Sequence, residues 1–118
     1  MRFHSEQVDT LTRERRQQAL AGLVERLRAR WPARCLGLDD ASLDSLVEEA
    51  RALGEEVQLT SRSGLETLAH CRLVFGPPPW PRRFAWPLGD GDRPALARNQ
   101  AFLKEADEAL RAEEERAR

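Results

Sequence analysis

The segment from Gly76 to Pro87 constrains the fold more than any other part of the chain, because it concentrates proline and tryptophan between two stretches with helical patterning. It holds five of the seven prolines and two of the three tryptophans. Proline fixes φ and has no backbone N–H, so this run can neither continue a helix nor lie inside a sheet. We expect a stiff, extended connection of polyproline type that presents aromatic side chains.

Before this segment, apolar residues recur every three or four positions, which is the spacing of one face of an α-helix. The pattern predicts a long first helix over residues 5–31, and Pro32 is expected to end it. An acidic second helix is expected to begin at Asp39 or Asp40, either of which can cap it, and to stop at Gly54.

Two further helices are predicted on either side of the Pro/Trp segment. The third begins at Ser61 or Ser63, since either serine can cap a helix, and ends at Gly76. The fourth follows a turn rich in glycine and aspartate, with Asp92 as its expected cap. Its highly charged end, residues 111–118, is expected to fray into solvent.

No segment shows the alternation of apolar and polar residues that is typical of a β-strand. Internal repeats and low-complexity linkers are also missing from the sequence. We therefore predict one all-α domain over residues 1–118, a small bundle of about four helices with the Pro/Trp segment between the third and the fourth.

Composition limits the possible partners and the compartment. The chain has 118 residues and a formal net charge of −1, so it lacks the positive field that attracts nucleic acid or acidic membranes. No stretch approaches the roughly 18 apolar residues that a membrane-spanning helix needs, and the N-terminus has no apolar signal-peptide core. We expect a cytoplasmic protein, in which Cys35 and Cys71 are small buried hydrophobes rather than a disulfide.

Residues that could carry catalytic or metal-binding chemistry are scattered along the chain. His4 lies near the terminus, and His70 and Cys71 are helical neighbours whose side chains point in different directions. The acidic pairs at 39–40 and 48–49 are expected to cap a helix or to lie on a solvated face. We predict no catalytic residue, no metal and no cofactor, and hence a protein that is not an enzyme.

A binding role fits the Pro/Trp segment better. Trp80, Phe84 and Trp86 are candidate aromatic anchors for a protein partner, and Arg82 and Arg83 would form a charged rim around them. In the alternative, one or both tryptophans fold back and cover an open side of a small bundle. The two interpretations can hold for different rings.

Two other binding functions are weighed against this one. The second and third helices could form a helix-turn-helix that reads DNA through Arg62 and Arg72, but the connection from Gly54 to Thr60 is longer than that motif uses. An immunity protein that neutralises a toxin would favour one strongly charged face. In this chain the charges change sign from segment to segment.

Short motifs along nearly the whole chain suggest a family. The chain resembles a group of small helical bacterial proteins encoded beside type VI secretion genes, among effectors, PAAR-tip or VgrG-spike proteins and their chaperones. The motifs that carry the resemblance are Phe3-x-x-x-Gln7-Val8-Asp9, Trp31-Pro32, Leu59-Thr60-Ser61, Phe75-Gly76-Pro77 and Trp86-Pro87.

The resemblance implies an accessory role without enzymatic activity, similar to that of a co-chaperone or adaptor. Its partner would be an effector, a PAAR-containing protein or the dedicated chaperone of either, bound before loading. The chain departs from the pattern at residues 77–79, where three prolines replace an expected acidic segment. Self-association through the first helix stays open.

Overall fold

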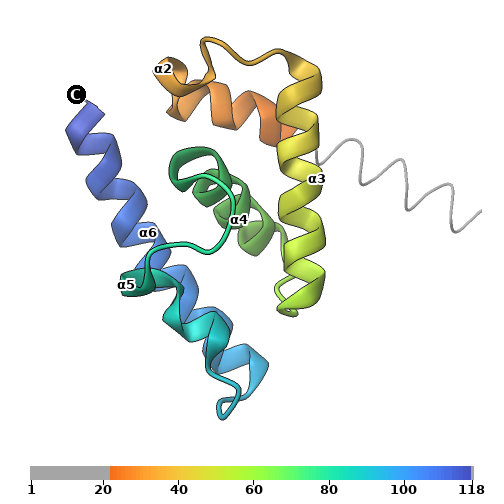
Figure 1. Cartoon of the computed structure of the whole chain (residues 1–118), viewed down its shortest axis with the longest axis vertical. Coiled ribbons are helices and arrows are strands. Elements are labelled where there is room, and N and C mark those ends of the chain that lie inside the picture. Colours follow the sequence, from red (N-terminus) through yellow and green to blue (C-terminus); the bar gives the residue numbers. More distant parts are fainter. Residues whose placement is uncertain (1–21, 118) are drawn as a thin grey trace, which may run out of the picture.

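The computed structural model describes residues 22–117, and every regular element in that range is helical (Figure 1). This confirms the predicted all-α class. The elements are a helix over residues 22–30, α2 (Pro32–Cys35), α3 (Asp40–Glu56), α4 (Arg62–Phe75), α5 (Arg82–Ala85), the 3-10 helix η1 (Trp86–Gly89) and α6 (Ala95–Ala117). The described range thus has six α-helical segments rather than about four, because α2 and α5 add single turns.

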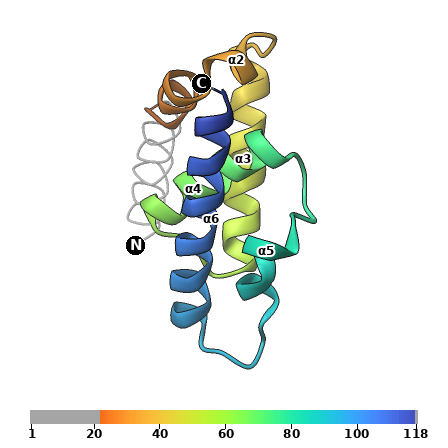
Figure 2. The same cartoon turned by 90° about the vertical axis from the view of Figure 1, so that its left-hand side faces the viewer.

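Helix α4 occupies the centre of the arrangement. It packs against α3 on one side and against α6 on the other, while α5 and η1 pack against α6. Figure 1 shows α3 and α6 flanking α4, and Figure 2 shows α5 beside the earlier turns of α6. The four consecutive residues 68–71 of α4 are all buried, and at 100° per residue they point around most of the helix, so α4 is covered by neighbours on more than one side.

The core draws one or more side chains from every long element. Its largest fully buried members are Leu27, Leu43, Leu68, Phe84, Phe102 and Leu110. Burial of each such side chain stabilises the fold by about 1.5–3 kcal/mol relative to exposure. Cys35 and Cys71 are also buried and form no disulfide, as the sequence predicts.

Three predicted helix ends are confirmed. The carboxylate of Asp39 accepts a hydrogen bond from the backbone N–H of Ser42 at 2.8 Å and caps α3. The hydroxyl of Ser61, rather than that of Ser63, caps α4 by accepting from the N–H of Gly64 at 3.1 Å. Gly76 ends α4 with φ of 82°, a conformation that favours glycine because it has no Cβ.

The predicted stop at Gly54 is wrong, since α3 continues to Glu56. Gly54 is buried inside the helix, and a Cβ there would lie 2.6 Å from the carbonyl oxygen of Leu59 and 2.9 Å from Leu65. The glycine therefore permits close approach of the α3–α4 connection. Val57 is the C-cap of α3, and the following residue, Gln58, takes a positive φ of 60°.

The predicted end of the first helix at Pro32 is also confirmed, since that helix stops at residue 30 and α2 is a separate turn. Trp31 leaves the helical conformation with φ of −125° and ψ of 60°, and Pro32 then opens the turn α2, where a missing N–H costs nothing. The expected beginning of this helix, residues 5–21, lies outside the described residues.

The start of α6 also differs from the prediction. The helix begins at Ala95, directly after Pro94, whose carbonyl accepts from the N–H of Arg98. Asp92 is therefore not its cap, and Asp90 organises the preceding turn by accepting from the N–H of Asp92 at 3.3 Å. At the other end, where fraying is expected, α6 stays helical to Ala117.

Ion pairs hold the last turns of α6 against the helix at 22–30 and α2. Glu114 pairs with Arg30, and Glu113 lies 3.5 Å from Arg34. The side chain of Glu113 is only 14% exposed, so its carboxylate is largely shielded from solvent where it meets Arg34. These contacts give the charged C-terminal segment a packing surface that its sequence alone does not reveal.

Candidate protein-interaction site around Trp86

Contrary to the prediction, the Pro/Trp segment is not an extended connection, because it bends at residues 77–79 and is helical from Arg82 onward. Residues 77–81 form the non-helical part, which contains a cis peptide bond between Pro78 and Pro79. The chain then turns into α5 and η1. The four residues from Arg82 to Ala85 contain no proline, and Pro87 stands in the first turn of η1, where a proline is tolerated.

Two of the three predicted anchors belong to the core. Phe84 is 1% exposed and Trp80 is 8% exposed. The ring of Phe84 lies 4.7 Å from that of Phe75, and Trp80 stacks on Phe102 with centroids 6.2 Å apart. The indole N–H of Trp80 donates to the carbonyl of Gly76 at 2.8 Å. Trp80 and Phe84 thus close the bundle and are not exposed anchors.

Trp86 is the exposed member of the group, with 40% of its surface accessible. The guanidinium of Arg93 lies 5.3 Å from the centre of its ring, within the range of a cation–π interaction. Asp90 pairs with the same Arg93 at 3.2 Å. Two residues that the sequence analysis assigned only to a turn therefore hold the indole in place.

A shallow groove of about 460 Å³ lies beside Trp86. Its lining consists of Trp80, Arg82, Ala85, Trp86, Gly89 and Asp90. Carbon surface from α5 and η1 forms most of it, and one cation and one anion stand at its edge. Such a groove can accept an apolar side chain of a partner while its rim contacts polar groups.

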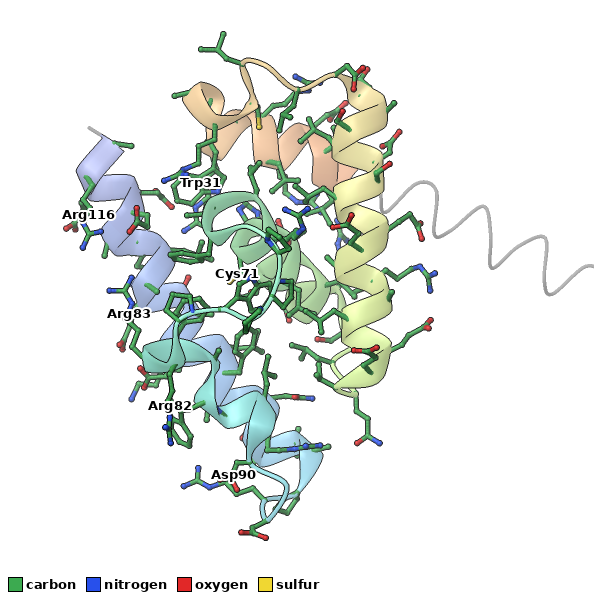
Figure 3. All side chains as sticks on the ribbon, in the orientation of Figure 1. Trp31, Cys71, Arg82, Arg83, Asp90 and Arg116 are labelled. Carbon is green, nitrogen blue, oxygen red and sulfur yellow. The ribbon has the colours of Figure 1, made fainter. Side chains whose placement is uncertain are left out.

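The two predicted rim arginines differ in position. Both side chains are exposed, yet only Arg82 lines the groove. Figure 3 shows Arg82 and Arg83 extending from different sides of α5, as consecutive helical residues must. Within residues 22–117 neither arginine forms an ion pair. Arg82 therefore keeps its place in the predicted site, whereas Arg83 lies beside it.

A second groove, of about 530 Å³, lies between the helix at 22–30, α4 and α6. His70 is part of its lining and is itself 4% exposed. The indole N–H of Trp31 donates to Nδ1 of His70 at 2.8 Å, which places the remaining proton of the neutral ring on Nε2. Burial, aided by Arg30, lowers the pKa of His70 to about 4.

This second groove has the electrostatics of a structural site. Its arginines are already compensated, since Arg26 pairs with Glu66 and Arg30 with Glu114. Burial raises the pKa of the neighbouring Cys71 thiol to about 12, so no thiolate forms near neutral pH. A neutral histidine bonded to tryptophan and an inert thiol do not make a nucleophile and base pair.

The arrangement of α3 and α4 bears on the DNA-binding alternative. Arg72, one of the two arginines considered for the groove of DNA, pairs with Glu49 of α3 at 2.6 Å. Arg62 is exposed on the first turn of α4. A single exposed arginine beside an acidic helix supplies little of the phosphate neutralisation that DNA binding requires.

The described range contains neither a metal-binding cluster nor a membrane-spanning helix. Across residues 22–117, no group of three or more His, Cys, Asp or Glu side chains is arranged to hold a metal ion. In the same part of the chain, no helix combines the length and the apolar composition needed to cross a membrane.

Comparison of the chain with protein-family models, with curated protein sequences and with solved structures finds no match.

Proposed function

We propose that this chain is a non-enzymatic accessory factor that binds another protein through Trp86 and Arg82. The observation that supports this most is the exposure of Trp86, at 40%, in a segment whose other large aromatic residues are buried. Tryptophan and arginine are the residues most enriched among the few that dominate protein–protein binding energy.

The indole of Trp86 is positioned before any partner arrives. Arg93 lies over its ring, and the backbone of Trp86 belongs to η1, which packs against α6. A held side chain loses little conformational entropy on docking, and each rotamer-rich side chain that needs no ordering saves about 0.5–1.5 kcal/mol. Trp86 can therefore contribute binding energy beyond the area that it buries.

The resemblance to proteins encoded beside type VI secretion genes supplies the proposed partner class. We propose an effector, a PAAR-containing protein or the chaperone of either, bound in the cytoplasm before loading. In this role the chain would act as a co-chaperone or adaptor, and the bound partner would do any chemistry.

The test is site-specific photo-crosslinking in the native host. One variant carries a benzophenone amino acid in place of Trp86, and a matched control carries it in place of Leu36, which is 85% exposed. Leu36 directly follows α2, and α2 lies away from α5 (Figure 1). We expect mass spectrometry to find a type VI effector, PAAR-containing protein or chaperone at position 86 and not at position 36. The same captured proteins at both positions, or none at position 86, would contradict the proposed site.

The captured protein is then purified and its affinity measured. We expect Trp86→Ala to weaken binding by roughly 2 kcal/mol or more, the effect typical of an interface anchor. An unchanged affinity would move the interface away from this groove. If the captured protein belongs to another pathway and its affinity depends on Trp86, the adaptor role would stand and the proposed partner class would be wrong.

A further inference from the structure

The charges around the groove at Trp86 restrict what can bind there. Arg93 is compensated by Asp90 at 3.2 Å, so this pair leaves no net charge at the groove. Arg82 lines the groove, and no acidic side chain of residues 22–117 pairs with it. Arg83, on the same turn, adds a second exposed cation nearby. The rim of the groove is therefore net positive although the chain as a whole carries −1.

We infer that the groove takes an acidic segment of a partner protein, with one apolar side chain seated against Trp86 and a carboxylate beside Arg82. This inference rests on the proposed function and adds the chemistry of the segment that is bound. A guanidinium presents a planar fork of donors that matches a carboxylate in two parallel hydrogen bonds. Ala85 and the ring of Trp86 supply the apolar contact next to it.

A protein segment fits this site better than a nucleic acid does. A single strand of DNA or RNA can stack a base on an exposed tryptophan, but it also needs a positive groove that follows several phosphates. Among the described residues that line the groove, Arg82 is the only cation, and it has no acidic partner in residues 22–117. One contact of each kind, apolar and anionic, is what a short acidic peptide offers.

The experiment is selection from a random-peptide phage library on the whole purified protein, after removal of phage that bind the Trp86→Ala variant. We expect the enriched peptides to combine Asp or Glu with an aromatic or aliphatic residue. One enriched peptide is then synthesised with a fluorophore, and its affinity is measured by anisotropy at physiological ionic strength.

Arg82→Glu and Arg83→Glu form a matched pair, because both reverse one exposed charge on the same turn and only Arg82 lines the groove. We expect Arg82→Glu to weaken peptide binding at least about tenfold, and Arg83→Glu by about threefold or less, since Arg83 does not line the groove and salt screens the attraction of an exposed charge that makes no direct contact. Equal effects of the two variants would show attraction to a diffuse charge, and would overturn the placement of the carboxylate at Arg82.

The other outcomes separate this inference from the function on which it rests. If the enriched peptides require Trp86 but are neutral or basic, the inference of an acidic segment would be overturned, and the docking site at Trp86 would stand. If no peptide depends on Trp86 and labelled oligothymidine binds in a way that does, both the acidic segment and the proposed protein-binding function would be overturned in favour of nucleic-acid binding. Self-association of the wild type that Arg82→Glu abolishes, measured by sedimentation, would replace the partner by a second copy of this chain.

Discussion

Trp80 and Trp86 lie six positions apart in the same proline-rich segment, yet they have opposite environments. Trp80 is sandwiched in an aromatic cluster with Phe84 and Phe102, and its N–H is bonded to Gly76. Trp86 lies at the surface with Arg93 over its ring. Similar local composition therefore places one tryptophan in the core and the other at the surface.

Helical geometry in the second half explains the difference. Residues two apart in a helix project roughly 200° from each other, so a chain that buries Phe84 against α6 turns Trp86 outward. Had the segment been extended throughout, residues two apart would share a face and both rings would lie on the same side. The turn α5 thus decides which aromatic residue stays exposed.

The largest effect is expected from Phe84→Ala, which removes the most buried ring of the segment. The cavity left between Phe75, Trp80 and Phe102 should lower the free energy of unfolding by about 3–5 kcal/mol, the usual cost for a core phenylalanine. Denaturant unfolding measures it, with Trp86→Ala as the control. A loss below about 1 kcal/mol for Phe84→Ala would mean that the ring is not part of the core.

Acid should destabilise the protein through His70, which accepts the hydrogen bond of the buried Trp31. It should leave the surroundings of Trp86 unchanged. The pKa of His70 is lowered to about 4 by burial, whereas an unfolded histidine titrates near 6.5. Below pH 6.5 the unfolded state binds the proton first, so stability is lost as the pH falls from about 6.5 towards 4. The loss should reach about 2–3 kcal/mol over this window.

The control for this prediction is His70→Gln, which keeps an acceptor for the N–H of Trp31 and cannot titrate. Its unfolding free energy should change less than that of the wild type between pH 6.5 and 5. Equal slopes for the two proteins would show that His70 is not buried as a neutral ring. Fluorescence that reports a change at Trp86 before unfolding would contradict the separation of the two sites.

A smaller effect is expected from Trp80→Phe, which keeps an aromatic ring over Phe102 but removes the hydrogen bond to the carbonyl of Gly76. The free energy of unfolding should fall by about 1 kcal/mol, the net contribution of one such bond, with some addition for the smaller ring. Thermal unfolding followed by circular dichroism measures the change. No loss at all would show that this bond does not fix the first half of the segment.

The smallest effect on stability is expected from Trp86→Ala. It removes a cation–π contact worth about 0.5–1 kcal/mol at an exposed site and creates no internal cavity. Helical content should stay the same, while binding of the partner falls sharply. A loss of stability as large as that of Phe84→Ala would place Trp86 in the core and remove the proposed docking site.

Much of the fold could be predicted from local patterns. Asp39, Ser61 and Gly76 act at helix ends through short-range bonds and backbone conformations, which depend on neighbouring residues in the sequence. Gly54 misled the prediction because its role depends on a backbone oxygen of Leu59 that approaches only in the folded chain. A close approach of this kind leaves no mark in a single sequence.

The candidate site could be predicted only in part, for a similar reason. Composition pointed to Trp80, Phe84 and Trp86 together, but burial of two of them depends on where Phe102 of α6 lies. The contacts of Arg93 with Trp86 and Asp90 could not be predicted, because the sequence of both residues is that of an ordinary turn. The type VI partner class stays a prediction from the motifs alone.

Acrylamide quenching of tryptophan fluorescence tests most directly whether the two halves of the segment differ. All three tryptophans lie in the described range, and only Trp86 is exposed. We expect part of the wild-type fluorescence to be readily quenched, and Trp86→Phe to remove that part and leave the emission of Trp31 and Trp80 protected. Quenching that is unchanged in Trp86→Phe would contradict the exposure of Trp86, and with it the proposed docking surface.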